Sequence, residues 1–160
     1  MATVSPSWAY TLHLPHDPRA PGIARATLRT VLAAHDLSPL TSTAELLASE
    51  LLTNAHLHTV GPYALRLRAM GSGRLRVAVW DADPRVPPGF GAVPPDDAES
   101  GRGLHLVRAC AEAVGVSVLG EAGASQSGKL LWAEFQEGGG LPLSAEPPQD
   151  ADGGRPESAL

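Results

Sequence analysis

The chain is short of several residue types, and each shortage excludes a class of protein. A single cysteine, Cys110, among 160 residues rules out an intramolecular disulfide and a multi-cysteine metal cluster. Lys and Arg number 12 against 17 Asp and Glu, so the net charge of −5 argues against non-specific binding of nucleic acid or of an anionic membrane. Aromatic residues make up only 4%, so the core is expected to consist mostly of Leu, Val and Ala.

Long hydrophobic runs are missing as well. No stretch approaches the roughly 20 apolar residues of a membrane span, and the N-terminus lacks the basic and apolar regions of a signal peptide. We therefore expect a cytoplasmic protein with no membrane partner. What the chain does have is 43% hydrophobic residues, together with 17 glycines and 15 prolines, which is typical of one compact domain with long loops.

Hydrophobic periodicity predicts the secondary structure. Period-two alternation indicates strands, and apolar residues at three- and four-residue spacing indicate helices. The predicted strands are 8–15, 63–69, 74–81, 116–120 and 129–135, and the predicted helices are about 22–35, 42–58 and 101–115. Ser42 and Glu45 have the spacing of a capping box at the start of the second helix. This order predicts an α+β two-layer sandwich, with a mixed, mostly antiparallel sheet and about three helices on one face.

The composition divides the chain into a domain at 1–137 and a tail at 138–160. The tail is rich in Gly, Pro and acidic residues and is expected to be disordered. A loop at 84–100 holds five prolines, and loops of this length are usually functional or disordered. The hairpin 63–81 carries four arginines on one face, which is either a solvated surface or a docking site for an acidic partner.

Three polar residues interrupt the second predicted helix at four-residue spacing: Glu50, Asn54 and His58. At about 100° per residue, Glu50 and Asn54 lie at the rim of the apolar stripe and His58 at its side, one turn further along. His56 points about 160° away from His58, so the His-Leu-His sequence does not form a chelating pair. Taken alone, the rim residues favour local backbone hydrogen bonding over a ligand site.

Two further segments carry potential binding groups. Asp81 ends an apolar strand, where its carboxylate either terminates the strand or accepts a hydrogen bond from an exocyclic amine. The segment Gly101-Arg102-Gly103-Leu104 precedes a helix, and its glycines would let the backbone approach an anion at the helix N-terminus. This is neither the dinucleotide fingerprint nor the phosphate loop of NTPases.

Together these segments resemble the ATP-binding fold shared by histidine kinases, gyrase-type ATPases and anti-sigma-factor serine kinases. ELLTNAHLH resembles the Asn-containing box of that group, VWDADPRVPP its first Asp/Gly box, and GRGLHLV its second Gly box. The resemblance covers roughly 8–136 and is closest to the small actinobacterial-type regulators of the anti-sigma kinase family.

The resemblance implies a role for each residue. Asn54 would hold the Mg²⁺ that bridges the ATP triphosphate, and Glu50 would act as the general base, or orient it, for phosphoryl transfer to a serine. Asp81 would bind the adenine amine, His58 would lie at the edge of the pocket, and residues 84–100 would form a lid. The remaining cofactor-binding residues would cradle the phosphates: Gly101, Arg102, Gly103 and Leu104.

The resemblance also implies partners, and it leaves alternatives open. The first hypothesis is an anti-sigma factor that binds a sigma factor and phosphorylates an anti-anti-sigma protein of the STAS type, with a homodimer as a further option. The alternative is a non-catalytic, ATP-dependent interaction module. A detached histidine-kinase catalytic domain is disfavoured, because no phosphoacceptor helix pair is visible. One departure bears on all three hypotheses: both glycines that often follow the aspartate are missing after Asp81.

Overall fold

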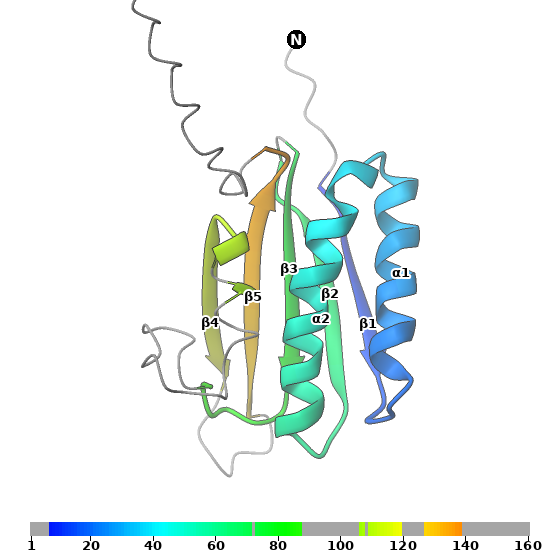
Figure 1. Ribbon diagram of the computed structural model, residues 1–160. Coiled ribbons are helices and arrows are strands. Elements are labelled where there is room, and N and C mark those ends of the chain that lie inside the picture. The colour runs from blue at the N-terminus through cyan, green and yellow to red at the C-terminus, as the bar shows by residue number, and fades with distance from the viewer. Residues whose placement is uncertain (1–6, 72, 88–105, 108, 120–126, 139–160) are drawn as a thin grey trace, which may run out of the picture.

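The computed structural model describes residues 7–71, 73–87, 106–107, 109–119 and 127–138. Within this part, five strands form one sheet and two α-helices cover it (Figure 1). The strands are β1 (Ala9–Leu14), β2 (Tyr63–Ala69), β3 (Arg74–Asp81), β4 (Ala113–Leu119) and β5 (Gly128–Gln136). The helices are α1 (Ala20–Ala34) and α2 (Thr41–His58), joined by the 3-10 turn η1 (Ser38–Leu40).

The sheet has the order β1-β2-β3-β5-β4, so β5 inserts between β3 and β4. Every described pairing is antiparallel. The expected α+β sandwich is thus confirmed, although the sheet is antiparallel throughout its described part and not mixed. The register brings the end of β3 beside the start of β5, with Asp81 opposite Lys129.

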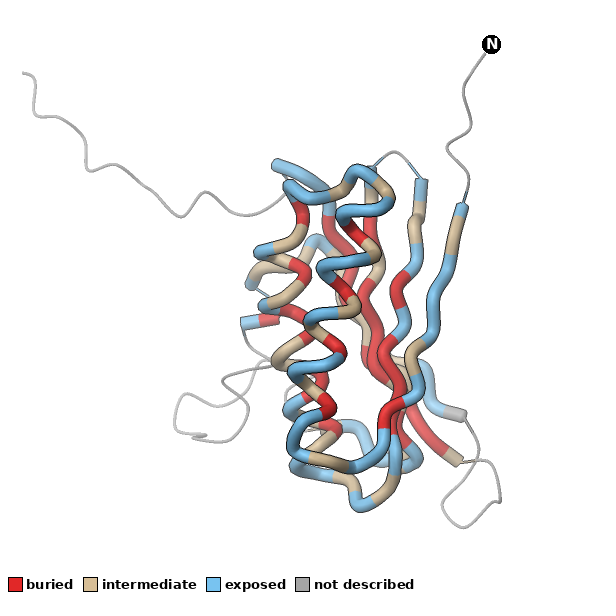
Figure 2. Tube along the Cα trace, turned by 90° about the vertical axis from the view of Figure 1, so that its right-hand side faces the viewer, coloured by how far each residue is buried: buried red, intermediate tan, exposed pale blue. Residues whose placement is uncertain are grey.

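The core lies between the helix layer and one face of the sheet, as the line of buried residues facing the sheet shows in Figure 2. The helix α1 buries one residue per turn, namely Ala20, Ala24, Leu28 and Leu32. The helix α2 buries six apolar residues: Ala44, Leu47, Ala48, Leu51, Leu52 and Ala55. Each fully buried leucine stabilises the fold by about 1.5–3 kcal/mol relative to an exposed one.

The start of α2 differs from the prediction. The helix begins at Thr41, directly after η1, and its N-cap is Leu40, with no side-chain capping bond. The prediction that Ser42 and Glu45 form a capping box is therefore wrong. The Glu45 carboxylate instead forms an ion pair with Arg29 of α1, because the two helices pack side by side and offer it a cation.

The third predicted helix also ends earlier than expected. Residues 106–107 and 109–110 are helical, and β4 begins at Ala113, within the range predicted as helix. Pairing with β5 overrides the helical preference of this alanine-rich stretch. Gly115 takes part in this pairing under the Trp132 ring, where an added Cβ would lie 2.0 Å from Trp132 Cζ2.

The sheet face away from the helices carries the four arginines of the hairpin. Arg66 and Arg68 are exposed, whereas Arg76 lies 4.3 Å from the centre of the Trp132 ring and donates to Glu134. Arg74 pairs with Glu112 at 2.6 Å. The charge of this face is therefore partly neutralised by its own acidic residues.

None of the helices in the described ranges is long and apolar enough to cross a membrane.

Candidate functional site

A pocket of about 330 Å³ opens where the C-terminal half of α2 meets the segment after β3 and the start of β5. Its described lining comes from three separate parts of the chain: Asn54, His58, Asp83, Arg85, Val86, Pro87 and Lys129. This volume falls within the range of about 300–1,000 Å³ that is usual for small-molecule sites. The mixture of amide, carboxylate and cationic groups suits a polar, charged ligand.

Asn54 is the residue of this pocket whose hydrogen bonding is incomplete. Its Oδ1 is buried and has no hydrogen-bond partner among the described residues. Leaving a buried acceptor unpaired costs about 1–3 kcal/mol, so a fold normally retains one only where something else satisfies it. An amide oxygen is a suitable ligand for a hard divalent cation such as Mg²⁺. The residues present therefore fit a magnesium nucleotide.

The other predicted residues of α2 are placed differently. His58 is exposed and lines the pocket, whereas Glu50 is half-buried one turn before Asn54 and is not part of the described lining. His56 points elsewhere: its Nδ1 lies 3.0 Å from the Tyr63 hydroxyl, and its ring stacks on His16 at 4.2 Å. In the described part of the chain, no cluster of three or more potential metal ligands of the His, Cys, Asp or Glu type occurs.

Asp81 lies next to the site and is ion-paired with Lys129, a residue of the pocket lining. Its side chain is 1% exposed and forms an ion pair with Lys129, which is 2% exposed, at 2.8 Å. Lys129 Nζ also donates to the Asp83 carbonyl oxygen at 2.8 Å, and the Asp83 N–H donates to Asp81 Oδ1 at 2.9 Å. Removing one partner of such a buried pair costs about 3–5 kcal/mol.

Lys129 is the residue of this site that the sequence reasoning missed. Lys129 lies on the same face of β5 as the buried residues Leu131, Ala133 and Phe135. A charged residue on a buried strand face is unusual, so it could have indicated a functional position. Gly128 explains how β5 comes this close to β3. A Cβ at this position would lie 2.5 Å from the Asp81 carbonyl oxygen and 2.8 Å from Trp80 Nε1.

A tight turn after β3 closes one side of the pocket. Arg85 donates to both carboxylate oxygens of Asp83, and its own N–H also reaches Oδ1 at 2.9 Å. The hydrogen bonds from Arg85 lower the pKa of Asp83 to about 2, so this carboxylate is ionised at neutral pH. The two glycines that often follow the aspartate in the family are absent after Asp81. The turn here is held by the ion pair of Asp83 and Arg85.

The predicted phosphate-binding segment Gly101, Arg102, Gly103 and Leu104 lies outside the described residues, as do the tail from 139 and the loop positions 88–100. Their assigned roles stay predictions.

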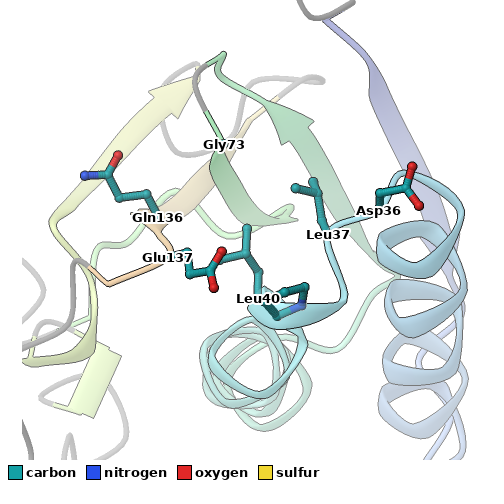
Figure 3. A pocket seen from close by; sticks show the side chains of 7 residues that line it. Asp36, Leu37, Leu40, Gly73, Gln136 and Glu137 are labelled. Carbon is teal, nitrogen blue, oxygen red and sulfur yellow. The ribbon is translucent and has the colours of Figure 1, made fainter.

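A second pocket of about 200 Å³ lies at the opposite end of the sheet, near the turn between β2 and β3 (Figure 3). Figure 3 shows Asp36 and Leu37 on one side and Glu137 on the other. None of its residues belongs to the motifs identified above, and no buried unpaired polar atom in the described part of the chain lies in its lining. We therefore assign the functional site to the pocket at Asn54.

The fold and this site define a nucleotide-binding class of protein, and a family comparison agrees. Residues 14–131 match the model of the histidine kinase-like ATPase domain, which is more than half of the chain. The chain belongs to the histidine kinase-like ATPase domain family. It is also 45% identical over 60 residues to the uncharacterized protein SCO4941 of Streptomyces coelicolor, over 38% of this chain and 57% of that relative's length.

Proposed function

We propose that the protein is an ATP-binding regulator that acts as an anti-sigma factor and phosphorylates a serine of a STAS-type anti-anti-sigma partner. The family match supports the coarser part of this proposal, an ATP-binding regulatory protein. The observation that carries it is the buried Asn54 Oδ1 at the pocket wall, which has no partner among the described residues.

In this proposal Asn54 would hold Mg²⁺, and ATP·Mg²⁺ would supply the phosphoryl group and the charge that activates it. The rest of the task is positioning, which is the main requirement of phosphoryl transfer. His58 and Arg85 line the same pocket and would border the ligand. The predicted backbone cradle, Gly101 to Leu104, would complete the phosphate end.

Glu50 is the proposed general base. It would accept the hydroxyl proton of the partner's serine as that oxygen is positioned for attack. Its half-buried place on α2, one turn before Asn54, sets a carboxylate on the same side of the helix as the proposed metal ligand. Among the described residues it makes no side-chain hydrogen bond that would engage the carboxylate elsewhere.

A second function, binding of ATP without transfer, is favoured by one specific observation. Glu50 does not border the described part of the pocket, so the base would need the partner, or further chain, to reach the reacting oxygen. In that case the protein would work as a nucleotide-dependent interaction module.

Calorimetric titration with ATP·Mg²⁺ tests nucleotide binding. We expect saturable binding to the wild type and a clear loss of affinity in Asn54→Ala. Thr53→Ala, an exposed neighbour on α2, serves as the matched control and should bind like the wild type. An unchanged titration in Asn54→Ala would remove the metal assignment, and no binding to any variant would remove both functions.

Transfer of labelled γ-phosphate to a purified STAS-type protein separates the two functions. Glu50→Gln should bind ATP as before and transfer no label. A wild type that binds ATP tightly and labels no such partner leaves only the interaction module.

A further inference from the structure

The far face of the sheet, which points away from α1 and α2, carries more positive charge than its own acidic residues balance. Both helices lie on the other face (Figure 1, Figure 2). Two of the four arginines on the far face, Arg74 and Arg76, form ion pairs with glutamates. The other two, Arg66 and Arg68, are exposed and form no ion pair with a described residue. In a chain with a net charge of −5, this surplus of positive charge needs an explanation.

The pairing of β2 with β3 places two of these charges directly opposite each other. Arg68 is the register partner of Arg76, and Arg66 is the partner of Ala78, diagonal to Arg76. Like charges at directly opposed positions of an antiparallel pair destabilise the sheet. Glu134, the register partner of Arg76 on β5, balances the charge of Arg76. No described acidic residue pairs with Arg68, so the isolated fold retains an unfavourable contact that an external carboxylate would relieve.

A shallow pocket of about 60 Å³ lies among three of these arginines. Its lining combines cationic and apolar residues: Ala9, Arg66, Leu67, Arg68, Arg76, Ala78 and Leu130. The volume is far below the range of about 300–1,000 Å³ that is usual for small-molecule sites. The far face therefore suits a macromolecule that lies across it, with its acidic groups on the arginines and its apolar atoms on the alanines and Leu130.

The spacing of the two exposed arginines matches an extended polypeptide. Arg66 and Arg68 lie two residues apart on one strand, so their side chains leave the same face of the sheet about 7 Å apart. An extended segment repeats its side chains on one face at the same interval, so carboxylates at alternate positions can meet both guanidinium groups. Each guanidinium can donate two parallel N–H bonds to one carboxylate.

Two observations favour a protein over a nucleic acid as the source of the negative charge. The net charge of −5 opposes the long-range attraction on which nucleic-acid binding depends. Single-stranded nucleic acids also need open aromatic rings on which bases stack. On the far face, the guanidinium of Arg76 lies over the Trp132 ring, 4.3 Å from its centre, and occupies that side of the ring.

We propose that the far face, at Arg66 and Arg68, binds an extended acidic segment of a partner protein that carries carboxylates at alternate positions. One carboxylate pairs with each arginine, and the shallow pocket receives apolar atoms of the same segment. This surface shares no lining residue with the pocket at Asn54, so the inference does not depend on nucleotide binding.

Two labelled synthetic peptides of identical composition test the proposal by fluorescence anisotropy with the full chain. In one peptide, glutamates alternate with threonines, and in the other the glutamates stand at every third position. We expect the alternating peptide to bind at least about threefold more tightly, because only it presents neighbouring carboxylates on one side. Its binding should weaken between about 20 mM and about 200 mM salt, since the contacts are exposed ion pairs.

Substitutions then locate the binding site. Arg66→Gln and Arg68→Gln should each weaken binding of the alternating peptide by about threefold or more. Arg25→Gln, on α1 at the other face of the sheet, removes the same charge and should bind like the wild type. No binding by the wild type, equal binding of the two peptides, or equal losses in Arg25→Gln and Arg68→Gln would overturn the proposal.

Stability gives an independent readout for Arg68. Arg68→Gln removes the charge opposite Arg76, so we expect its urea midpoint to lie above that of the wild type. A lower midpoint would show that the fold itself satisfies Arg68, and it would contradict the proposal. Urea curves of all the variants also show that each one is folded.

Two further outcomes would assign the far face to another occupant and overturn the proposal. One is binding of single-stranded oligothymidylate that is tighter than that of the alternating peptide and is lost in Arg68→Gln. The other is a dimer of the wild type in sedimentation equilibrium that becomes a monomer in Arg68→Gln, which would make a second copy of the chain the occupant.

Discussion

At the scale of single residues, Asn54 is the position where folding and binding make opposite demands. Its buried Oδ1 has no partner in the described part of the chain, and the residue as a whole is half-buried, next to the buried Ala55 of α2. A leucine of similar size would remove the unpaired acceptor and add apolar contact. We expect Asn54→Leu to raise the free energy of unfolding by about 1 kcal/mol, measured by urea denaturation of the ligand-free protein.

Thr53→Leu, on the exposed side of the same helix, is the control for added apolar surface and should change stability by less than about 0.5 kcal/mol. A clear destabilisation by Asn54→Leu would mean that the amide is satisfied in the fold, and the case for a ligand at Oδ1 would weaken.

The residues predicted from the sequence divide according to the range of the interactions that place them. Asn54 and His58 could be assigned to the pocket side of a helix because helical geometry is local. For Lys129 the sequence offers only the signal of a charge on a buried strand face, because its partner Asp81, 48 residues away in the chain, is brought to it by the pairing of β3 and β5. The role of Asp81 as the adenine-binding group stays a prediction; the structure adds that its carboxylate is ion-paired with Lys129.

At the scale of elements, the contact between β4 and β5 depends on one glycine. Gly115 lies against the Trp132 ring, and a Cβ would overlap it at 2.0 Å. We expect Gly115→Ala to lower the free energy of unfolding by about 2 kcal/mol, since the ring must move and its stacking with Arg76 is disturbed. Thermal or urea denaturation measures this loss.

Gly61→Ala is the matched control, because nothing lies within 4 Å of the Cβ that it would add. Its stability should stay within about 0.5 kcal/mol of the wild type. Equal effects of the two substitutions would show that the glycine backbone, and not the tryptophan contact, accounts for the loss.

The turn 83–87 offers a second prediction at this scale, on acid titration. The hydrogen bonds from Arg85 lower the pKa of Asp83 from 3.8 to about 2 in the folded protein. Because the folded pKa is the lower one, the ion pair stabilises the turn above pH 3.8, and this contribution is lost as the pH falls through about 2. Arg85→Gln should return the pKa of Asp83 toward 3.8, as measured by carboxyl NMR titration. A pKa that stays near 2 would assign the shift to other groups.

The bounds of helices and strands were predicted correctly where one local sequence pattern dominated. They were predicted wrongly where tertiary contacts competed with that pattern. The strands 63–69 and 74–81 agree with the structure at both ends, because alternation and a glycine turn coincide. The capping box at Ser42 failed because Arg29 of another helix captured Glu45. The helix predicted to run to 115 ends earlier because β5 recruits Ala113 and its successors into the sheet.

At the scale of the whole molecule, the pocket exists only in the folded chain. Its described lining combines α2, the segment after β3 and the start of β5, which are far apart in the sequence. A ligand that binds there therefore stabilises the native state against global unfolding. At a free concentration one hundred times its Kd, such a ligand adds about 2.7 kcal/mol.

The proposal that Asn54 holds Mg²⁺ makes this stabilisation dependent on the metal. The chain carries a net charge of −5, so an ATP molecule without Mg²⁺ meets an overall repulsive protein and loses its link to the Asn54 oxygen. At one fixed ATP concentration, urea denaturation should show the full increment with Mg²⁺ and a much smaller one with excess EDTA. In Asn54→Ala the two curves should nearly coincide, while Thr53→Ala should keep the separation. Equal stabilisation of the wild type with and without Mg²⁺ would show that the nucleotide is held without the metal, and that the unpaired Asn54 oxygen serves another purpose.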